Sequence, residues 1–182
     1  MNLPGNKRRG IVNGLQRKPY TMFVSNTDFQ IRRISTRDFQ QVKEALKFLT
    51  EVEPLSQEKF DKVLEYWSTY KLPESDIPVY NCFVIVPVNN SGEETGEVAA
   101  VGTIFIEQKL IHGGALTGHI EDIAVNGKFQ GMKLGKKLIN HLSQYGLDNG
   151  CYKVILDCEE KNIGFYEKCN FNQHGIEMQI RK

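Results

Sequence analysis

The chain has 182 residues, of which 40% are apolar, and a chain of this size and composition can bury a core for one domain. Its 23 basic and 22 acidic residues nearly balance, so no global electric field favours a nucleic-acid partner. No apolar run approaches the length of a membrane span. These properties favour a single domain with a small-molecule partner.

The N-terminal segment 1–27 differs in composition from the rest of the chain. It carries lysine and arginine but no acidic residue, and few apolar residues before Tyr20. We expect a flexible extension ahead of one domain at 28–182. A basic, acid-free segment is also typical of an organelle transit peptide, but this one has little serine and weak amphipathicity.

Cysteine and histidine usage points to neither disulfides nor metal. The four cysteines form no C-x-x-C pair; they are Cys82, Cys151, Cys158 and Cys169. We expect reduced, mostly buried thiols in a cytosolic protein, and structural rather than nucleophilic roles. The histidines show no metal-ligand spacing; they are His112, His119, His141 and His174.

The first part of the predicted domain is one strand followed by two helices. Residues 29–34 alternate in hydrophobicity as a strand does. Ser35 and Asp38 have the pattern of a capping box, and apolar residues then recur at helical spacing to Thr50. A second helix with one apolar stripe begins at the cap residue Ser56.

The second part adds five strands and two helices. Hydrophobic periodicity and turn residues predict strands at 80–88, 98–111 and 117–125, a helix at 134–149, a strand at 153–158, a short helix at 162–169 and a strand at 175–180. The strand at 153–158 is apolar enough to be buried on both faces. We expect Asn170 to form a turn.

The stretch VNGKFQGMKLGKKL at 125–138 resembles a phosphate-binding turn. The spacing of Gly131 and Gly135 fits neither a P-loop nor a dinucleotide fingerprint. A strand that leads through a short turn into a helix still offers unpaired N–H groups to phosphate oxygens. The alternative is a solvated basic helix start, although Lys133, Lys136 and Lys137 are mildly unfavourable near a helix N-terminus unless an anion offsets them.

The same stretch carries a family resemblance. Residues 130–135 (QGMKLG) resemble the Q/R-x-x-G-x-G/A loop of the GNAT N-acetyltransferases, and the order of strands and helices is similar too. Four further blocks narrow the resemblance to eukaryotic glucosamine-6-phosphate N-acetyltransferases over roughly 29–182: GHIEDIAV at 118–125, CYKVILDC at 151–158, NIGFYEKCNF at 162–171 and GIEMQIRK at 175–182. The chain departs from the family pattern at Lys133 and Asn170, where glycine is usual.

The resemblance implies an α/β (α+β) GNAT fold, with a mixed, mostly antiparallel sheet of about six strands, splayed at a β-bulge and flanked by about four helices. It implies acetyl transfer from acetyl-CoA to the amine of glucosamine 6-phosphate by direct attack in a ternary complex, without metal. The product would be N-acetylglucosamine 6-phosphate on the route to UDP-N-acetylglucosamine. The family also implies a homodimer with shared active sites.

The resemblance assigns site residues position by position. The implied coenzyme-binding residues are Ile123, Ala124, Val125, Gln130, Gly131, Met132, Lys133, Leu134, Gly135, Lys136, Asn162, Tyr166, Glu167 and Lys168. The implied sugar-phosphate residues are Thr50, Lys109, Leu110, Ile111, His112, Glu121, Asp122, Ile123, Tyr152, Lys153, Asp157 and Arg181.

Three of these residues are implied to be catalytic: Tyr166, Glu121 and Asp157. Tyr166 would protonate the departing thiolate; the sequence alone favours a half-buried packing residue, and the resemblance reverses that interpretation. Glu121 or Asp157 is a candidate base for the amine proton, directly or through water, unless the amine binds already neutral.

Glu121 and Asp122 pose a geometrical problem, because adjacent residues of a regular strand face opposite sides of the sheet. A β-bulge would turn both carboxylates toward one pocket and splay the strand from its neighbour. Lys133 raises a narrower question: it can serve in the phosphate loop if its φ is negative.

Two other functions stay open from the sequence. One is the same fold acting on another amine, such as a protein lysine, a peptide N-terminus or a polyamine. The other is an acetyl-CoA-binding module without catalysis. The presence of Tyr166, Glu121, Asp122 and Asp157 together argues against the second.

Overall fold

The computed structural model describes residues 28–180, and the predictions for segment 1–27 and for Arg181 fall outside these residues. The described residues form one open sheet in the order β1-β2-β3-β4-β5. The first four strands pair antiparallel, and β5 runs parallel to β4. The strands are β1 (Asp28–Arg33), β2 (Tyr80–Val88), β3 (Ala100–Gln108), β4 (Leu116–Val125) and β5 (Cys151–Ile155).

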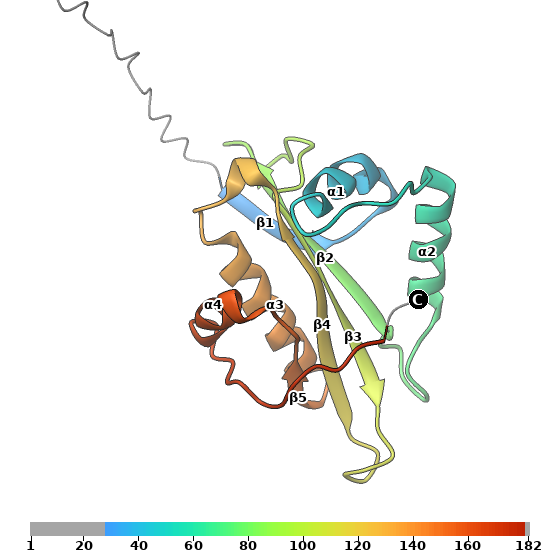
Figure 1. The fold of residues 1–182 in the computed structure, drawn as a ribbon. Helices are drawn as coiled ribbons and strands as arrows, with labels where there is room; N and C mark the ends of the chain where they lie inside the picture. Colours follow the sequence, from blue (N-terminus) through green and yellow to red (C-terminus); the bar gives the residue numbers. More distant parts are fainter. Residues whose placement is uncertain (1–27, 181–182) are drawn as a thin grey trace, which may run out of the picture.

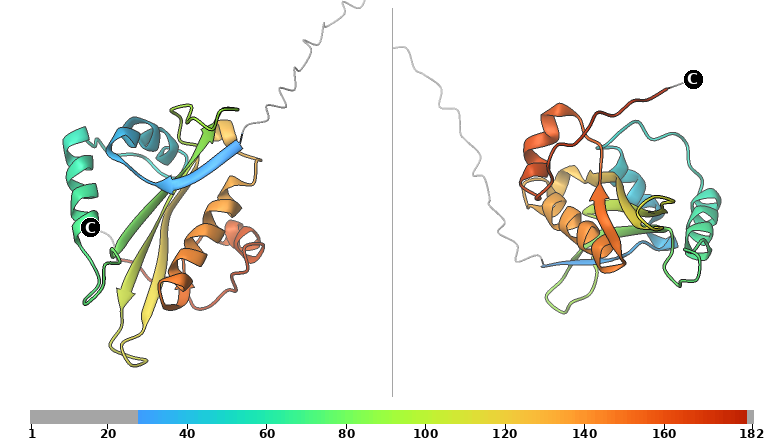
Figure 2. Two further views of the ribbon diagram at one scale, coloured as in Figure 1. Left: turned by 180° about the vertical axis from the view of Figure 1, so that it is seen from behind. Right: turned by 90° about the horizontal axis from the view of Figure 1, so that it is seen from below.

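Helices cover both faces of this sheet (Figure 1), with α1 and α2 on one face and α3 and α4 on the other. The view from below in Figure 2 shows the same two layers with the sheet between them. The helices are α1 (Phe39–Leu46), α2 (Gln57–Thr69), α3 (Leu134–Asp148) and α4 (Ile163–Glu167). Three short 3-10 helices join these elements: η1 (Thr36–Asp38), η2 (Gly127–Phe129) and η3 (Glu160–Asn162).

Local capping explains where the helices start. Asp38 Oδ2 accepts from the backbone N–H of Ser35 at 2.7 Å, and the guanidinium of Arg32 also holds this carboxylate. Ser56 Oγ accepts from the backbone N–H of Lys59 at 3.1 Å, at the start of α2. Both predicted caps are confirmed.

The predicted end of the first helix is wrong by one turn. The helix ends at Leu46, and the next turn is closed by i→i+3 bonds from Phe48 to Ala45 and from Leu49 to Leu46. The reason lies in the apolar pattern, because Phe48 and Leu49 are about half exposed rather than packed against the sheet. Thr50 therefore lies in the loop after α1.

Two core clusters hold the layers together. On the α3 face, Leu138, Ile139 and Leu142 are fully buried against sheet residues such as Ile85 and Ile104. The α1 and α2 face buries a second set that comprises Phe39, Val42, Ala45, Phe60, Cys82, Val84, Val86, Val98, Val101 and Ala124. The layers are therefore fixed by apolar burial on both faces of β2 and β3.

Two predictions at the C-terminal side are wrong. β5 is an edge strand whose Tyr152 is 46% exposed, not a strand buried on both faces. Residues 175–180 form no strand; in the view of Figure 1 the segment crosses in front of β4 and β3 toward α2, and Ile176 and Ile180 are at least 90% exposed. A strand forms only where a partner completes its ladder, and no described strand lies beside this segment.

No helix within residues 28–180 combines the length and the apolar character needed to cross a bilayer.

Candidate active site

The site is built around the point where β4 and β5 separate. Their parallel ladder ends at the pair His119–Ile155, whereas β4 continues along β3 to Val125. In the described chain, the last residues of β4 therefore have a strand on one side only. A separation of this kind leaves backbone groups of β4 free to bind a ligand in the gap.

The direction of these backbone groups follows from one hydrogen bond. The N–H of Asn126 donates to Ala99 O at 3.0 Å, so Asn126 faces β3. Backbone N–H groups of successive strand residues point alternately to the two sides of the strand. The N–H of Ala124 therefore also points toward β3, whereas the N–H groups of Ile123 and Val125 point into the gap. The gap thus presents two donors to an extended ligand.

The predicted bulge lies in β4 opposite β3. Between the pairs that flank it, Gly102 on β3 faces both Asp122 and Ile123 on β4, and Asp122 has a φ of 54°. A Cβ at position 102 would meet the Cδ1 methyl of Ile123, so a larger residue there would force that side chain to shift. Glu121 pairs with Thr103, and Asp122 lines a cavity together with Thr103, so both carboxylates lie on the α1–α2 face.

Carboxylates gather at this bulge. Burial raises the pKa of Glu121, and the nearby Asp122 and Asp157 raise it further. Burial also raises the pKa of Asp122. Sequence reasoning missed one member of the group, Glu177, which acts on Glu121 in the same direction from the C-terminal segment. Among residues 28–180, no group of three His, Cys, Asp or Glu side chains is arranged to hold a metal ion.

Tyr166 lies on α4, on the other side of the gap. Its ring packs edge-on against Phe165 and Phe171, with centroids 5.0 and 6.2 Å away. Burial raises the pKa of the Tyr166 phenol, and the thiols of Cys158 and Cys169 raise it further. The phenol therefore keeps its proton at neutral pH and can act as a donor.

The segment after β5 connects the two groups. Asp157 acts on Glu121, and the next residue, Cys158, acts on Tyr166. Asp157 lies past the end of β5, not within a strand as predicted, because pairing with β4 stops at Ile155. The carboxylates and the phenol thus border one gap from opposite faces of the sheet.

An anion cradle lies at the start of α3. Gly131 has a φ of 81°, Lys133 has a φ of 60°, and no side chain caps the helix. Leu134 is buried, so its contribution to a ligand is its backbone N–H. Left-handed residues that precede an uncapped helix turn successive N–H groups toward one point, which suits a phosphate oxygen.

The left-handed conformation of Lys133 is a correction. From the sequence, a negative φ was the condition for lysine in this loop, but Lys133 is the N-cap residue of α3 and has φ 60° and ψ 17°. A side chain in this region costs roughly 1–2 kcal/mol relative to a right-handed conformation. Asn170, the other departure from the family pattern, has a φ of 69°, which asparagine tolerates as expected.

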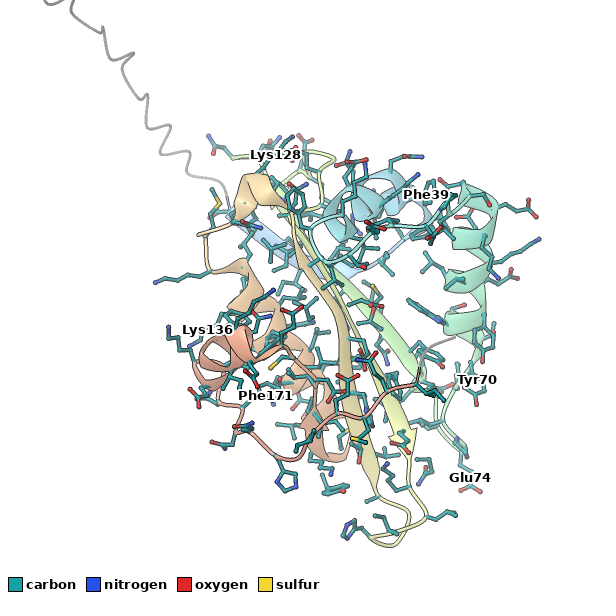
Figure 3. The ribbon with its side chains drawn as sticks, viewed as in Figure 1. Phe39, Tyr70, Glu74, Lys128, Lys136 and Phe171 are labelled. Atoms are coloured by element: carbon teal, nitrogen blue, oxygen red, sulfur yellow. The ribbon has the colours of Figure 1, made fainter. Side chains whose placement is uncertain are left out.

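Neighbouring lysines anchor the cradle instead of filling it. Lys136 Nζ donates to Lys168 O at the end of α4, and Lys137 Nζ donates to Phe29 O at 2.8 Å. Figure 3 shows Lys136 where α3 and α4 meet, near Phe171. The first contact joins the start of α3 to α4, which contains Tyr166 and Glu167 and is flanked by its cap residues Asn162 and Lys168; the second joins it to β1.

The predicted phosphate ligands lie away from the carboxylates of the same chain. Lys109 follows β3 six residues after Thr103, the partner of Glu121, which is roughly 20 Å along a strand. Its Nζ lies 2.6 Å from Glu107 Oε2. At the adjoining hairpin tip, Leu110 is fully exposed and Ile111 is 61% exposed.

The tip forms a small group with β5. The ring of His112 lies 5.1 Å from that of Tyr152, and Lys153 Nζ lies 5.4 Å from the Tyr152 ring centroid. Lys153 pairs with Thr117, roughly 13 Å from Glu121 along β4. Within one chain, the catalytic candidates Glu121, Asp157 and Tyr166 therefore border the same gap. The predicted phosphate ligands at the β3–β4 hairpin lie away from them.

Sequence reasoning also missed a cavity of about 140 Å³ beneath α1 and α2. Its lining is mostly apolar and includes the predicted α2 stripe, but Asp122 and Thr103 contribute polar groups. The stripe was predicted to be a core face, and side-chain periodicity cannot reveal whether the facing residues fill the space between them. Asp122 therefore borders open volume and not a filled core.

A sheet splayed beside an anion cradle, with carboxylates and a phenol at the gap, is the arrangement of an acyltransferase that uses a phosphorylated acyl carrier. A family model described as the acetyltransferase (GNAT) family matches residues 40–171. The chain belongs to this family.

Curated relatives cover most of the chain. A glucosamine 6-phosphate N-acetyltransferase from Candida albicans is 41% identical over 84% of this chain and 95% of the relative. The one from Dictyostelium discoideum is 36% identical over 86% and 93%. The crystal structure of the enzyme from Arabidopsis thaliana has a TM-score of 0.72 and 34% identity, and covers 85% of this chain and 98% of that one.

Replacing Lys133 with glycine tests whether the cradle is strained. We expect Lys133→Gly to raise the free energy of unfolding by about 0.5–1 kcal/mol in urea titrations, because glycine adopts this φ without strain although it also loosens the unfolded chain. Coenzyme affinity should change modestly, and turnover at saturating acetyl-CoA should stay nearly intact.

Lys133→Ala is the matched control, since it removes the charge but keeps the left-handed strain, and it should gain no stability. Collapse of turnover in Lys133→Gly at saturating acetyl-CoA would show that the lysine has a chemical role.

Proposed function

We propose that this chain transfers the acetyl group of acetyl-CoA to the amine of glucosamine 6-phosphate, giving N-acetylglucosamine 6-phosphate and CoA. Relatives that bear this activity in their names, at 33–41% identity over more than four fifths of the chain, support the choice of acceptor. The observation that carries it is the gap between β4 and β5, with carboxylates at one face and a phenol at the other. This product would feed the synthesis of UDP-N-acetylglucosamine.

The coenzyme would lie in the gap between β4 and β5. Its pyrophosphate would bind the N–H groups at the start of α3, and its pantetheine would pair with the edge of β4 at Val125, which leaves the N–H of Ile123 for the thioester carbonyl. The residues at the end of α4 would border the pantetheine arm of the coenzyme. This placement brings the thioester sulfur to the side of the gap where Tyr166 lies.

The reaction then needs two proton transfers. The amine nitrogen attacks the thioester carbonyl carbon, so a C–N bond forms and the C–S bond breaks. The N–H of Ile123 donates to the carbonyl oxygen as negative charge develops on it. Glu121, with Asp157 beside it, takes the proton from nitrogen, and Tyr166 gives its proton to the departing thiolate.

A raised pKa suits Glu121 to the role of base. A carboxylate with an ordinary pKa is a weak base at neutral pH, and burial together with Asp122 and Asp157 makes Glu121 a stronger one. The same cluster is attractive to a cationic amine before it loses its proton. Asp157 would serve mainly to hold the amino group.

We propose a homodimer that completes this site. Ile176, Met178 and Ile180 form one apolar row that is 90–99% exposed, and the outer edge of β5 faces no described strand. A two-fold dimer would let each C-terminal segment pair with the other subunit, as exposed strands do. It would also bring cations such as Lys109 and Arg181 toward the partner's carboxylates.

We place the enzyme in the cytosol. Cys82, Cys151 and Cys169 are buried free thiols, and Cys158 is an exposed one. Burial raises the pKa of Cys82 to about 12, so this thiol is inert. Reduced cysteines of this kind are common where thiols are kept reduced.

An acceptor panel tests the substrate. CoA thiol release is followed from acetyl-CoA with glucosamine 6-phosphate, glucosamine, glucosamine 1-phosphate, spermine and a lysine peptide in parallel. We expect turnover with the 6-phosphate to exceed every other acceptor by more than about a hundredfold in kcat/KM, because a lost charge-assisted phosphate contact costs about 3 kcal/mol. Equal turnover without the phosphate would contradict the proposal.

The same assay tests the proton donor through a matched pair of variants. Tyr166→Phe should lower kcat far more than it raises either Michaelis constant, whereas Tyr66→Phe, at an exposed position of α2 outside the site, should not lower kcat. A loss of coenzyme binding equal to the loss of kcat would mean that Tyr166 only packs.

Sedimentation of the full chain tests the dimer. The double variant Ile176→Asp/Met178→Asp should sediment as a monomer and lose about tenfold or more in turnover, since it places charges in an apolar interface. Leu147→Asp alters an equally apolar residue on α3 that is half exposed, and it should stay dimeric and active. A fully active monomeric wild type would contradict the proposal.

A further inference from the structure

His119 lies on β4 beside the carboxylate cluster, and two neighbouring side chains hold its ring in place. Its Nε2 lies 2.9 Å from Glu107 Oε2, and its ring stacks on Phe105 with centroids 4.5 Å apart and planes 14° from parallel. Lys109 Nζ lies 2.6 Å from the same carboxylate oxygen of Glu107. The imidazole is therefore fixed on two sides, by an acid at its nitrogen and by an aromatic face beneath it.

The strand register places His119 on the same face of the sheet as Glu121. His119 pairs with Phe105, and Glu121 pairs with Thr103 on the same strand, before the bulge interrupts the alternation. Residues two apart on a strand lie on the same face, roughly 7 Å from each other. His119 and Glu121 are thus neighbours on the face that carries the acidic site.

The charges around Glu121 make this neighbour distinctive. From β4, Asp122 faces it; from the segment after β5, Asp157; and from the C-terminal segment, Glu177. All three oppose its ionisation. A positive charge on His119 acts in the other direction and lowers the pKa of Glu121. On the β3 side, Glu107 contacts both His119 and Lys109.

We propose that His119 is a positioning residue for acetyl transfer: clamped between Glu107 and Phe105, it keeps Glu121 ionised among the other acids, and so available to take the amine proton. This inference rests on the proposed role of Glu121 as the base. A carboxylate surrounded only by other acids would bind a proton from water and lose its function at mildly acidic pH. A positive charge on the His119 ring, on the same strand face, would oppose that repulsion.

A purely structural histidine would have a different signature. Stacking on Phe105 and hydrogen bonding to Glu107 could be served by a neutral polar side chain of similar size. The charge of the ring would then be irrelevant to Glu121. Neutral and cationic replacements at position 119 therefore separate the two roles.

The test follows the ionisation of Glu121 directly. The ¹³C signal of its carboxyl carbon is titrated in the full-length enzyme and assigned by its absence in Glu121→Gln, and the pH dependence of kcat is recorded alongside. His119→Gln should move the Glu121 midpoint upward by about 0.5–1 pH unit, with the acidic limb of kcat following. His119→Arg, which keeps a cation able to stack, should hold both near the wild-type values.

His174→Gln is the control for the substitution itself, because His174 is exposed and lies outside the site; it should leave both profiles unchanged. Thermal melts of all variants confirm that each is folded. An unchanged Glu121 midpoint in His119→Gln, or an equal shift in His119→Arg, overturns the role of His119.

A different outcome would rule out Glu121 as the base without ruling out its coupling to His119. If the midpoint moves in His119→Gln while the acidic limb does not, and Glu121→Gln keeps that limb, then Glu121 is not the base. That result would still support the electrostatic coupling between the two residues.

Discussion

The separation of β4 from β5 is the feature on which the rest of the molecule depends. A strand in the middle of a sheet normally has both edges paired, and unpaired backbone groups away from water are costly. Here β4 loses its neighbour after His119, so Ile123 and Val125 direct donors into a gap. The start of α3, the carboxylates at the bulge and the phenol of α4 are all placed relative to this gap.

The bulge makes the gap chemically useful. Without it, Glu121 and Asp122 would face opposite sides of the sheet, and one of them would point into the α3 core. Gly102 makes room for the Ile123 side chain at the same position, so the turn of the carboxylates and the packing of the core depend on one another. Burial and the cluster of like charges that results raise the pKa of Glu121, which is a cost to stability but suits a base.

Local signals in the sequence were enough to predict most elements. The caps at Ser35 and Ser56 and the stop at Asn149 depend on residues close in the chain, and each was found in the structure. The family resemblance supplied the roles of the site residues, which local patterns do not contain. The two wrong predictions concern strand pairing between distant segments. The predicted strand at 175–180 has no neighbouring strand among the described residues, and β5 is exposed because it forms the sheet edge.

Other features could not be read from the chain because they arise from packing between distant segments. Glu107 and His119 are brought together by the register of β3 and β4, and Glu177 reaches Glu121 only through the path of the C-terminal segment. The cavity beneath α2 depends on how two helices meet the sheet. The positive φ of Lys133 was not predicted, because lysine rarely adopts one. The turn at Asn170 was predicted, because asparagine tolerates a positive φ.

Amide hydrogen exchange along β4 tests the central claim most directly, since neighbouring residues there face opposite sides. The account predicts that Ile123 and Val125 exchange rapidly in the free enzyme and at least about tenfold more slowly with saturating acetyl-CoA, as their N–H groups gain partners. Ala124 and Asn126, which face β3, should be protected in both states. Unchanged exchange at Ile123 and Val125 in an enzyme that has bound acetyl-CoA would contradict the account.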